Sequence, residues 1–122
     1  MTRYERKFEK ERLNKVSCMS NTKWEKFFKA VANSDISFSN ETVKCLADEC
    51  IRSFSLERDA LSYNRYVTAD SIAGPFDYKY IEWIFVPAVR VNDIPALKKL
   101  IDGLGLYEYD FDENGLKIYG YK

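Results

Sequence analysis

The chain has 122 residues, enough to bury one hydrophobic core and too few for two, so we expect a single domain over residues 1–122. Apolar residues make up 46% and aromatic residues 16% of the sequence, which excludes intrinsic disorder and leaves aromatic side chains for a contact surface. The 19 basic and 19 acidic residues balance, so the chain as a whole has no electrostatic attraction to nucleic acid.

The absence of histidine from the sequence removes several chemistries at once. It excludes Ser-His-Asp and Cys-His catalysis, histidine proton shuttles and most zinc sites. The three cysteines, Cys18, Cys45 and Cys50, lack metal-ligand spacing, and we interpret them as small apolar residues rather than reactive thiols. An odd number of cysteines without a signal peptide predicts a reduced, cytoplasmic protein, and no apolar run approaches the length of a membrane span. We expect no metal, no cofactor and no membrane association.

Residues 1–17 predict a basic, peripheral helix. Thr2 and Glu5 have the spacing of a capping box, and the apolar positions that follow are sparse, so most of the helix should face solvent. The first 29 residues carry nine basic and four acidic side chains. A basic helix can contact nucleic acid or an acidic partner, but the interspersed glutamates favour a solvated face, and we expect no direct contact with nucleic acid.

A second helix should begin after Ser20-Asn21, which has the residue types of an N-cap. The large apolar residues that follow recur at i, i+3, i+4 and i+7: Trp24, Phe27, Phe28 and Val31. This is the strongest helical pattern in the chain and predicts a buried stripe with the lysines outside.

The next stretch carries weaker signals. Residues 36–38 and 42–47 are candidate short strands, and residues 51–56 alternate between apolar and polar side chains as a half-buried strand does. Residues 63–70 are consistent with a loop or an edge segment that leads into the strongest strand.

That strand lies near residues 78–86, between Gly74-Pro75 and Pro87, and its apolar and aromatic residues predict a strand covered on both faces, or nearly so. A helix of the same length is the alternative. Glu82 lies within it. A desolvated Glu82 would be a candidate general acid or base, whereas a Glu82 paired with a lysine or arginine, or placed at an exposed edge, would have a structural role.

The C-terminal third predicts a helix and a hairpin. Asn92-Asp93 and Pro95 mark the start of a helix near 93–103, which ends at its glycines. In the hairpin that follows, Asn114-Gly115 supplies the positive-φ residues of a tight turn. The whole predicts an α+β fold: two N-terminal helices, a mainly antiparallel sheet around the central strand, one further helix and a C-terminal β-hairpin.

Acidic residues gather in this region. From Asp102 to Glu113 there are five acids and no base, and their spacing does not match an EF-hand. Alternation places Tyr107, Tyr109 and Phe111 on one side of the strand and the acids Glu108 and Asp110 on the other. The acids form either a negative patch for a basic partner protein or a charged edge that resists aggregation.

Three segments together resemble a small bacterial family that is a domain of unknown function. They are Asn21-Thr-Lys-Trp24, Gly74-Pro-Phe76 with Tyr78 and Ile81-Glu-Trp-Ile84, and Leu116-Lys-Ile-Tyr-Gly-Tyr121. The resemblance extends from about Lys15 to Lys122 and implies a bacterial, cytosolic protein. It brings no activity, catalytic residue or cofactor.

By analogy of size and chemistry, such a protein looks like an immunity protein, which binds and neutralises a toxin domain. A nuclease toxin suits an acidic inhibitor because its surface is basic where it binds phosphates. The expected partner is therefore a cognate toxin domain. The expected contact residues are Tyr107, Glu108, Tyr109, Asp110, Asp112 and Glu113, with Asp70 and Asp77 as outliers. Two alternatives are a small enzyme or ligand-binding domain around Glu82 and a self-associating regulatory module that forms a homodimer through a sheet edge.

Overall fold

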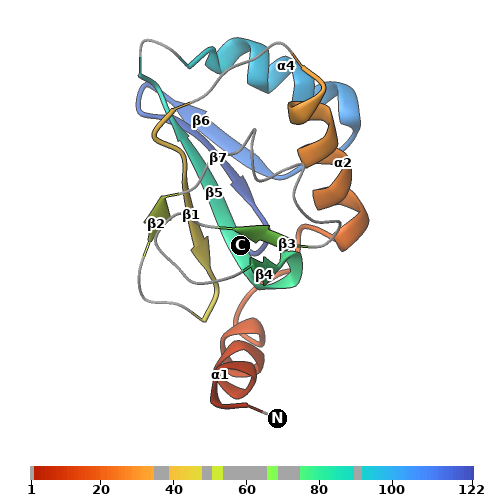
Figure 1. Cartoon of the computed structure of the whole chain (residues 1–122), viewed down its shortest axis with the longest axis vertical. Helices are drawn as coiled ribbons and strands as arrows, with labels where there is room; N and C mark the ends of the chain where they lie inside the picture. Colours follow the sequence, from red (N-terminus) through yellow and green to blue (C-terminus); the bar gives the residue numbers. More distant parts are fainter. Residues whose placement is uncertain (1, 35–38, 48–50, 54–65, 69–74, 90–91) are drawn as a thin grey trace.

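The α+β fold predicted from the sequence is confirmed in a computed structural model of the chain (Figure 1). The structure describes residues 2–34, 39–47, 51–53, 66–68, 75–89 and 92–122. For residues 52–53, 66–68 and 75–77 within these ranges, it describes the backbone alone. The candidate strand at 36–38 lies outside the described residues.

Three α-helices of the described chain begin at the residues that the sequence predicts as caps. The Thr2 hydroxyl accepts the Glu5 N–H at the start of α1 (Arg3–Arg12), and the Ser20 hydroxyl accepts the Lys23 N–H at the start of α2 (Asn21–Ala32). The Asp93 carboxylate accepts the Ala96 N–H at the start of α4 (Ile94–Leu104). Each cap satisfies a backbone donor that the helix itself leaves unpaired.

The first helix is shorter than predicted, because it ends at Arg12 rather than near residue 17. The chain beyond it pairs with the C-terminus instead. Val16 N–H donates to Lys122 O at 3.0 Å, Cys18 N–H donates to Gly120 O at 2.8 Å, and Ser17 forms an antiparallel bridge with Tyr121. These long-range bonds supply the backbone partners that further helical turns would have supplied.

Five strands form an antiparallel sheet in the order β2-β1-β5-β7-β6. The predicted central strand is β5 (Ile81–Pro87), which lies in the middle of this order. It begins at Ile81 rather than at Tyr78, because Tyr78–Tyr80 form a 3-10 turn, η1. That turn buries the Tyr78 ring against Phe28 of α2, with 5.1 Å between the ring centroids.

The remaining strands complete two sheets. The candidate strand at 42–47 is β1 (Thr42–Cys45), and the one at 51–56 contributes β2 (Arg52–Ser53), its last three residues lying outside the described chain. The segment at 63–70 contains β3 (Tyr66–Thr68), which pairs with β4 (Pro75–Asp77) in a separate two-stranded sheet.

The C-terminal hairpin pairs β6 (Tyr109–Asp112) with β7 (Gly115–Tyr119). Only Gly115 of the Asn114-Gly115 pair has a positive φ, 146°, so the expectation of two positive-φ residues in the turn was wrong. A Cβ on Gly115 would lie 2.3 Å from Val86 O, so this position admits no side chain even apart from its φ.

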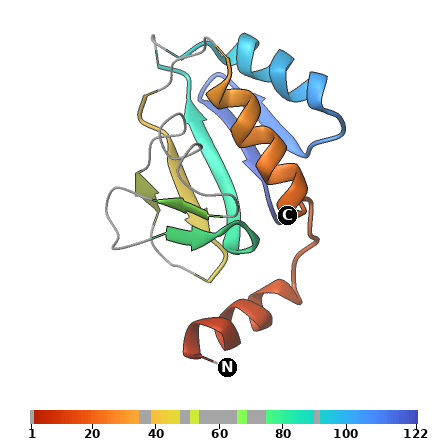
Figure 2. The ribbon, with the colours of Figure 1, turned by 45° about the vertical axis from the view of Figure 1, so that its right-hand side comes forward.

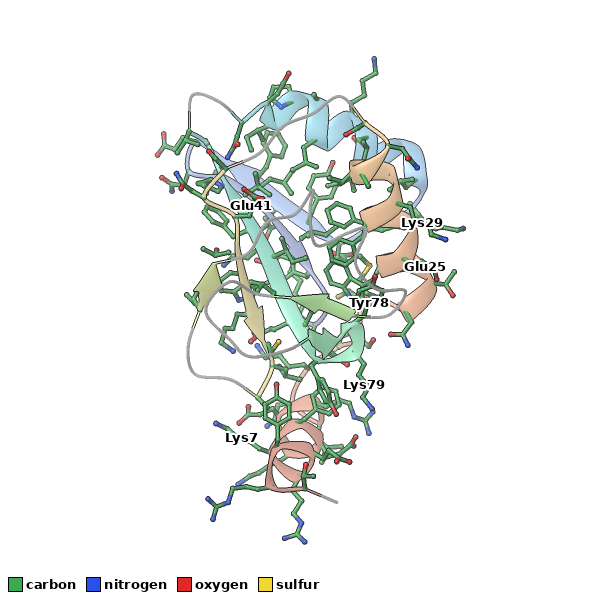
Figure 3. All side chains as sticks on the ribbon, in the orientation of Figure 1. Lys7, Glu25, Lys29, Glu41, Tyr78 and Lys79 are labelled. Carbon is green, nitrogen blue, oxygen red and sulfur yellow. The ribbon has the colours of Figure 1, made fainter. Side chains whose placement is uncertain are left out.

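The main core lies between one face of the five-stranded sheet and the helices α2 and α4, which lie side by side on it (Figures 1 and 2). The predicted α2 stripe is confirmed, since all four of its residues are buried, while Glu25 and Lys29 pair at 2.7 Å along the outer side of the helix (Figure 3). The sheet contributes a facing set of buried side chains: Ile81, Ile84, Val86, Leu116 and Ile118.

The other face of β5 is less completely covered, as the prediction of a strand covered on both faces or nearly so allows. Trp83 and Phe85 on that face are only half-buried. Part of the cover on Trp83 comes from the neighbouring strand β7, where Lys117 Nζ lies 4.5 Å from the centre of the Trp83 ring. Lysine stems can shield an aromatic ring in this way while the ammonium group stays in water.

Helix α1 packs at one end of the molecule, away from the main core (Figures 1 and 2). Its single buried residue, Phe8, contacts the Tyr80 ring edge-on at 4.9 Å and joins a small cluster with Leu46, Ala47 and Tyr121. The rest of α1 is mostly solvated, as the sparse apolar pattern predicts.

Candidate functional site: an acidic sheet edge and its pocket

The predicted acidic residues of the hairpin lie on the outermost strand of the sheet. Strand β6 is the last in the sheet order, and Glu108, Asp110, Asp112 and Glu113, on it or directly beside it, are all exposed. We call these four residues the acidic edge. An exposed row of like charge at a sheet margin produces a local negative potential even in a chain of zero net charge.

The charges of this edge are only loosely compensated. Lys122 Nζ lies 3.7 Å from a Glu108 oxygen and 3.9 Å from an Asp110 oxygen, distances that hold an ion pair but no hydrogen bond. Asp110 also accepts the Tyr119 hydroxyl at 3.0 Å. Exposed pairs of this kind contribute little to stability, so most of the carboxylate charge is available to a partner.

The two tyrosines predicted to share this surface point the other way. The Tyr107 hydroxyl donates to Lys23 O at 3.0 Å, and the Tyr109 hydroxyl donates to Asp102 Oδ1 at 2.6 Å. Both side chains are half-buried and pack against the main core. The predicted alternation is therefore confirmed: the acids lie on one side, and the tyrosines lie on the other, where they attach the hairpin to α2 and α4.

These hydrogen bonds shift the pKa values of the groups that make them. The bond from Tyr109 holds the pKa of Asp102 below its ordinary value, and the same bond raises the pKa of Tyr109, because it joins the charged carboxylate to the neutral phenol. Burial raises the pKa of the Tyr107 hydroxyl. Near neutral pH, Asp102 is thus ionised and both tyrosines are neutral donors.

Sequence reasoning missed two apolar neighbours of the acidic edge. Leu106 is 91% exposed and Phe111 is 53% exposed, although both are large hydrophobic residues. Lys98 Nζ of α4 lies 5.5 Å from the centre of the Phe111 ring. Alternation had placed Phe111 with the tyrosines, and only its position on the outer strand, where no further strand of the described chain covers it, leaves it exposed.

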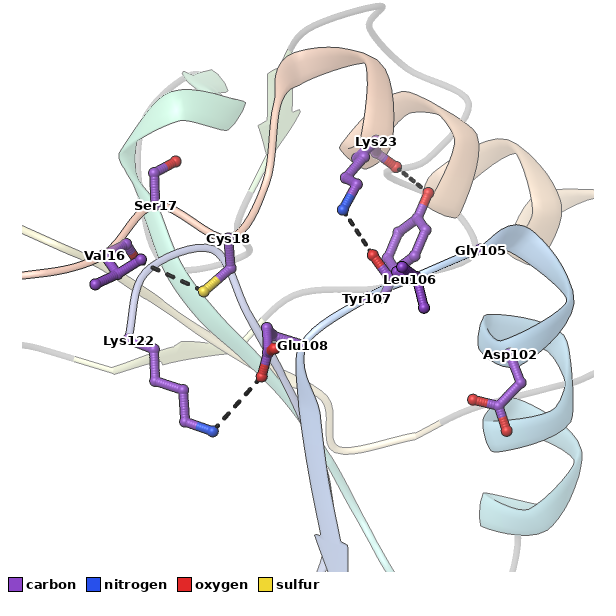
Figure 4. A pocket seen from close by; sticks show the side chains of 10 residues that line it. All are labelled: Val16, Ser17, Cys18, Lys23, Asp102, Gly105, Leu106, Tyr107, Glu108 and Lys122. Atoms are coloured by element: carbon purple, nitrogen blue, oxygen red, sulfur yellow. Dashed lines mark hydrogen bonds and ion pairs between the residues drawn. The ribbon is translucent and has the colours of Figure 1, made fainter.

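A pocket of about 690 Å³ adjoins the acidic edge at Glu108 (Figure 4). Five segments meet there: the link before α2, the first turn of α2, the last turn of α4, the connection from α4 to β6, and the C-terminus. Its lining residues are Val16, Ser17, Cys18, Lys23, Asp102, Gly105, Leu106, Tyr107, Glu108 and Lys122. The volume falls in the range of small-molecule sites.

The polar groups of this pocket are mostly engaged with one another. Lys23 Nζ donates to Leu106 O at 2.6 Å, and the Cys18 thiol lies 3.5 Å from Val16 O. Burial, with a further contribution from Glu108, raises the pKa of the Cys18 thiol, so it is less nucleophilic than a free cysteine.

Glu82 is paired with lysines, one of the arrangements that the sequence left open. Its carboxylate forms a hydrogen-bonded ion pair with Lys44 and lies 3.5 Å from Lys15 Nζ. Its side chain is 13% exposed, so the two lysines compensate a largely desolvated charge. No described acid or base other than these lysines contacts the Glu82 carboxylate.

Of the two outlying candidates, Asp70 lies outside the described residues, and Asp77 lies in β4, where only the backbone is described. Strand β4 belongs to the two-stranded sheet rather than to the sheet that carries the acidic edge. Cys45 is buried, as predicted, and Cys18 is half-buried, while Cys50 lies outside the described chain.

The described residues contain no group of three or more cysteine, aspartate or glutamate side chains close enough to hold a metal ion. Their helices are too short or too polar to cross a lipid bilayer.

Comparison with known proteins finds no family model, no curated protein and no solved structure that matches this chain. The resemblance to a small bacterial family therefore stays a prediction from the sequence.

Proposed function

We propose that this chain is a protein-binding domain of the immunity-protein type, which neutralises a basic toxin domain, such as a nuclease, by covering it with the acidic edge. The observation that carries the proposal is the placement of four exposed carboxylates on the outermost strand of the sheet or directly beside it, next to the exposed apolar side chains of Leu106 and Phe111. The charges steer a basic partner, and the apolar side chains bury surface once it has docked.

The proposed contact surface is limited to the acidic edge, without the predicted Tyr107 and Tyr109, because of the hydrogen bonds of the hairpin. The hydroxyls of Tyr107 and Tyr109 are used within the fold, so a partner would gain little from them. Glu108 and Asp110 have no partner closer than 3.5 Å among the described lysines and arginines, so a lysine or arginine of the toxin could pair with them at small desolvation cost.

Protection against aggregation is the alternative explanation of the same acids. Protection by charge alone would not account for a leucine and a phenylalanine left exposed at the same margin. An enzymatic site at Glu82 gains no support from the geometry, because both described partners of that carboxylate are lysines that neutralise it.

The test is an affinity capture in which three tagged versions of this protein are used to retain partners from a lysate of the bacterium that encodes the chain. They are the wild type, the edge variant Glu108→Lys/Asp110→Lys, and a control variant Glu9→Lys/Glu11→Lys, which makes the same change in charge on α1. We expect the wild type and the control to retain a basic polypeptide whose toxic activity they inhibit, and the edge variant to lose it, more sharply at low salt.

Circular dichroism first establishes that the edge variant folds, which the exposure of both side chains predicts. Retention of the same toxin by the edge variant would rule out the acidic edge as the binding surface. If none of the three proteins inhibits a polypeptide that it captures, the immunity function itself is ruled out.

A further inference from the structure

The backbone of β6 has one row of hydrogen-bonding groups turned toward β7 and a second row turned outward. The register pairs Asp110 with Lys117 and Asp112 with Gly115, and Tyr119 N–H donates to Glu108 O at 2.9 Å. In an antiparallel ladder every second residue exchanges hydrogen bonds with the neighbouring strand. Residues 108, 110 and 112 therefore bond to β7, and the N–H and C=O groups of Tyr109 and Phe111 point away from the sheet.

We propose that β6 accepts an extended basic segment of the partner as a sixth strand of the sheet, an inference that rests on the proposed function and specifies how the acidic edge binds. Within the described chain no strand lies beyond β6. The outward groups of Tyr109 and Phe111 supply the main-chain hydrogen bonds of strand addition. Side chains on the two faces of β6 then select the sequence of the added strand.

The two faces of β6 favour different side chains in the added strand. Asp110, with Glu108 and Asp112, lies on the face opposite the helices, beside Lys117 and Tyr119 of β7. A residue of the added strand directly opposite one of these acids would have its Cβ about 5 Å away, where a lysine or arginine forms a favourable cross-strand pair. Phe111 projects on the helix-bearing face, where an apolar residue would cover its ring. The recognised segment thus alternates basic and apolar residues.

A second copy of this chain is a poor occupant of the same edge. Two β6 strands paired edge to edge would bring the acidic side chains of both copies onto the same face at cross-strand distance. Like charges in these positions destabilise a sheet, and natural edge strands use them to prevent self-pairing. The acidic edge therefore disfavours pairing with a second copy of itself and favours pairing with a strand of opposite charge.

Protection of the outward amides from hydrogen exchange tests strand addition, because binding by charge alone would not produce it. The probe is the octapeptide acetyl-Lys-Val-Lys-Val-Lys-Val-Lys-Val-amide, with the glutamate-for-lysine peptide as its control. Hydrogen exchange followed by NMR should show the amides of Tyr109 and Phe111 slowed about tenfold or more by the basic peptide. The amides of Asp110 and Asp112, already bonded to β7, should change little.

A matched pair of variants separates the contribution of the Phe111 backbone N–H to binding from that of its side chain. Phe111→Pro removes the outward N–H without removing a bond to β7, which an edge strand tolerates, whereas Phe111→Ala removes the ring and keeps the N–H. We expect Phe111→Pro to weaken binding of the basic peptide about tenfold more than Phe111→Ala does. If Phe111→Pro fails to fold, the exchange measurement on the wild type decides.

Equal binding by folded Phe111→Pro and Phe111→Ala, or no slowing of either outward amide at saturating peptide, would overturn strand addition. So would equal binding of the glutamate peptide. Capture of an inhibited toxin that depends on Glu108 and Asp110, without protection of the outward amides, would overturn strand addition and leave the immunity function standing. Protection by the basic peptide without any captured toxin supports strand addition and counts against the immunity function.

Discussion

Gly120, in the terminal Tyr-Gly-Tyr, offers the sharpest test of how the C-terminus joins the core. A Cβ built on Gly120 would lie 2.1 Å from the carbonyl oxygen of Ile81 and 3.1 Å from Trp24 Cζ2. Both Gly120 N–H, at 2.7 Å, and Tyr121 N–H, at 3.1 Å, donate to the carbonyl oxygen of Glu82, so the obstructing backbone belongs to the central strand. Neither side can move away as the end of a flexible side chain could.

The substitution Gly120→Ala should therefore force the two backbones apart by roughly 1 Å to restore van der Waals contact. Overpacking of this kind costs about 1–3 kcal/mol, and the two weakened hydrogen bonds add about 0.5–1.5 kcal/mol each, for a total of about 2–6 kcal/mol. With a urea m-value of about 1–3 kcal/mol/M, the unfolding midpoint should fall by on the order of 1–3 M.

The assay is equilibrium unfolding in urea, followed by tryptophan fluorescence and by circular dichroism so that two-state behaviour is checked. Gly103→Ala is the matched control, because a Cβ there meets nothing within 4 Å and the position lies in the last turn of α4. It should stabilise the protein by about 0.4–1 kcal/mol, since alanine is the better helix former. A Gly120→Ala midpoint within error of the wild type would refute the packing argument.

Three further predictions follow from contacts away from Gly120. Tyr109→Phe removes the hydrogen bond that lowers the pKa of Asp102, so carboxyl NMR should show that pKa rise. The stability that this bond contributes is fully present above the ordinary aspartate pKa and disappears as pH falls through the lowered pKa. The variant should therefore lose less stability than the wild type between pH 5 and pH 2. An unchanged Asp102 pKa would contradict this. The Cys18 thiol should react with iodoacetamide at pH 8 more slowly than a free cysteine peptide does, as mass spectrometry of the alkylated peptide would show, because burial raises its pKa; an equal rate would contradict the assignment. Phe8→Ala should speed amide exchange throughout α1 while the amides of β5 stay protected, since Phe8 is the buried anchor of that helix; equal loss of protection in both would show that α1 unfolds only with the core.

Local signals in the sequence determined where the helices begin and which faces of α2 and of the hairpin are buried. Short-range patterns depend on residues a few positions apart, and the capping residues Thr2, Ser20 and Asp93 begin their helices as predicted for that reason. The helical repeat from Trp24 to Val31 identified the buried face of α2, and period-two alternation separated Glu108 and Asp110 from Tyr107 and Tyr109. Each of these predictions needed only the geometry of a helix or a strand.

Partners distant in sequence were not predictable. Buried Asn92, read as part of a helix cap, instead bonds with its side-chain amide to Ser39 N, Ser39 O and Pro87 O, at 2.7, 2.8 and 2.9 Å. Glu82 could be recognised as a carboxylate in need of a partner, but Lys44 and Lys15 reach it only through the pairing of β1 with β5 and the return of the N-terminal link to the C-terminus. No local spacing encodes such contacts.

The position of β6 at the sheet margin was decided by tertiary structure in the same way. The sequence determined that the hairpin alternates between acids and aromatics, and strand order decided which groups remain exposed. Because β5 pairs with β7 rather than with β6, β6 is left as the outer strand, with its acids and the Phe111 ring exposed and its outward backbone groups paired with no strand of the described chain. Alternation is a property of one strand, whereas exposure depends on what the rest of the chain places beside it.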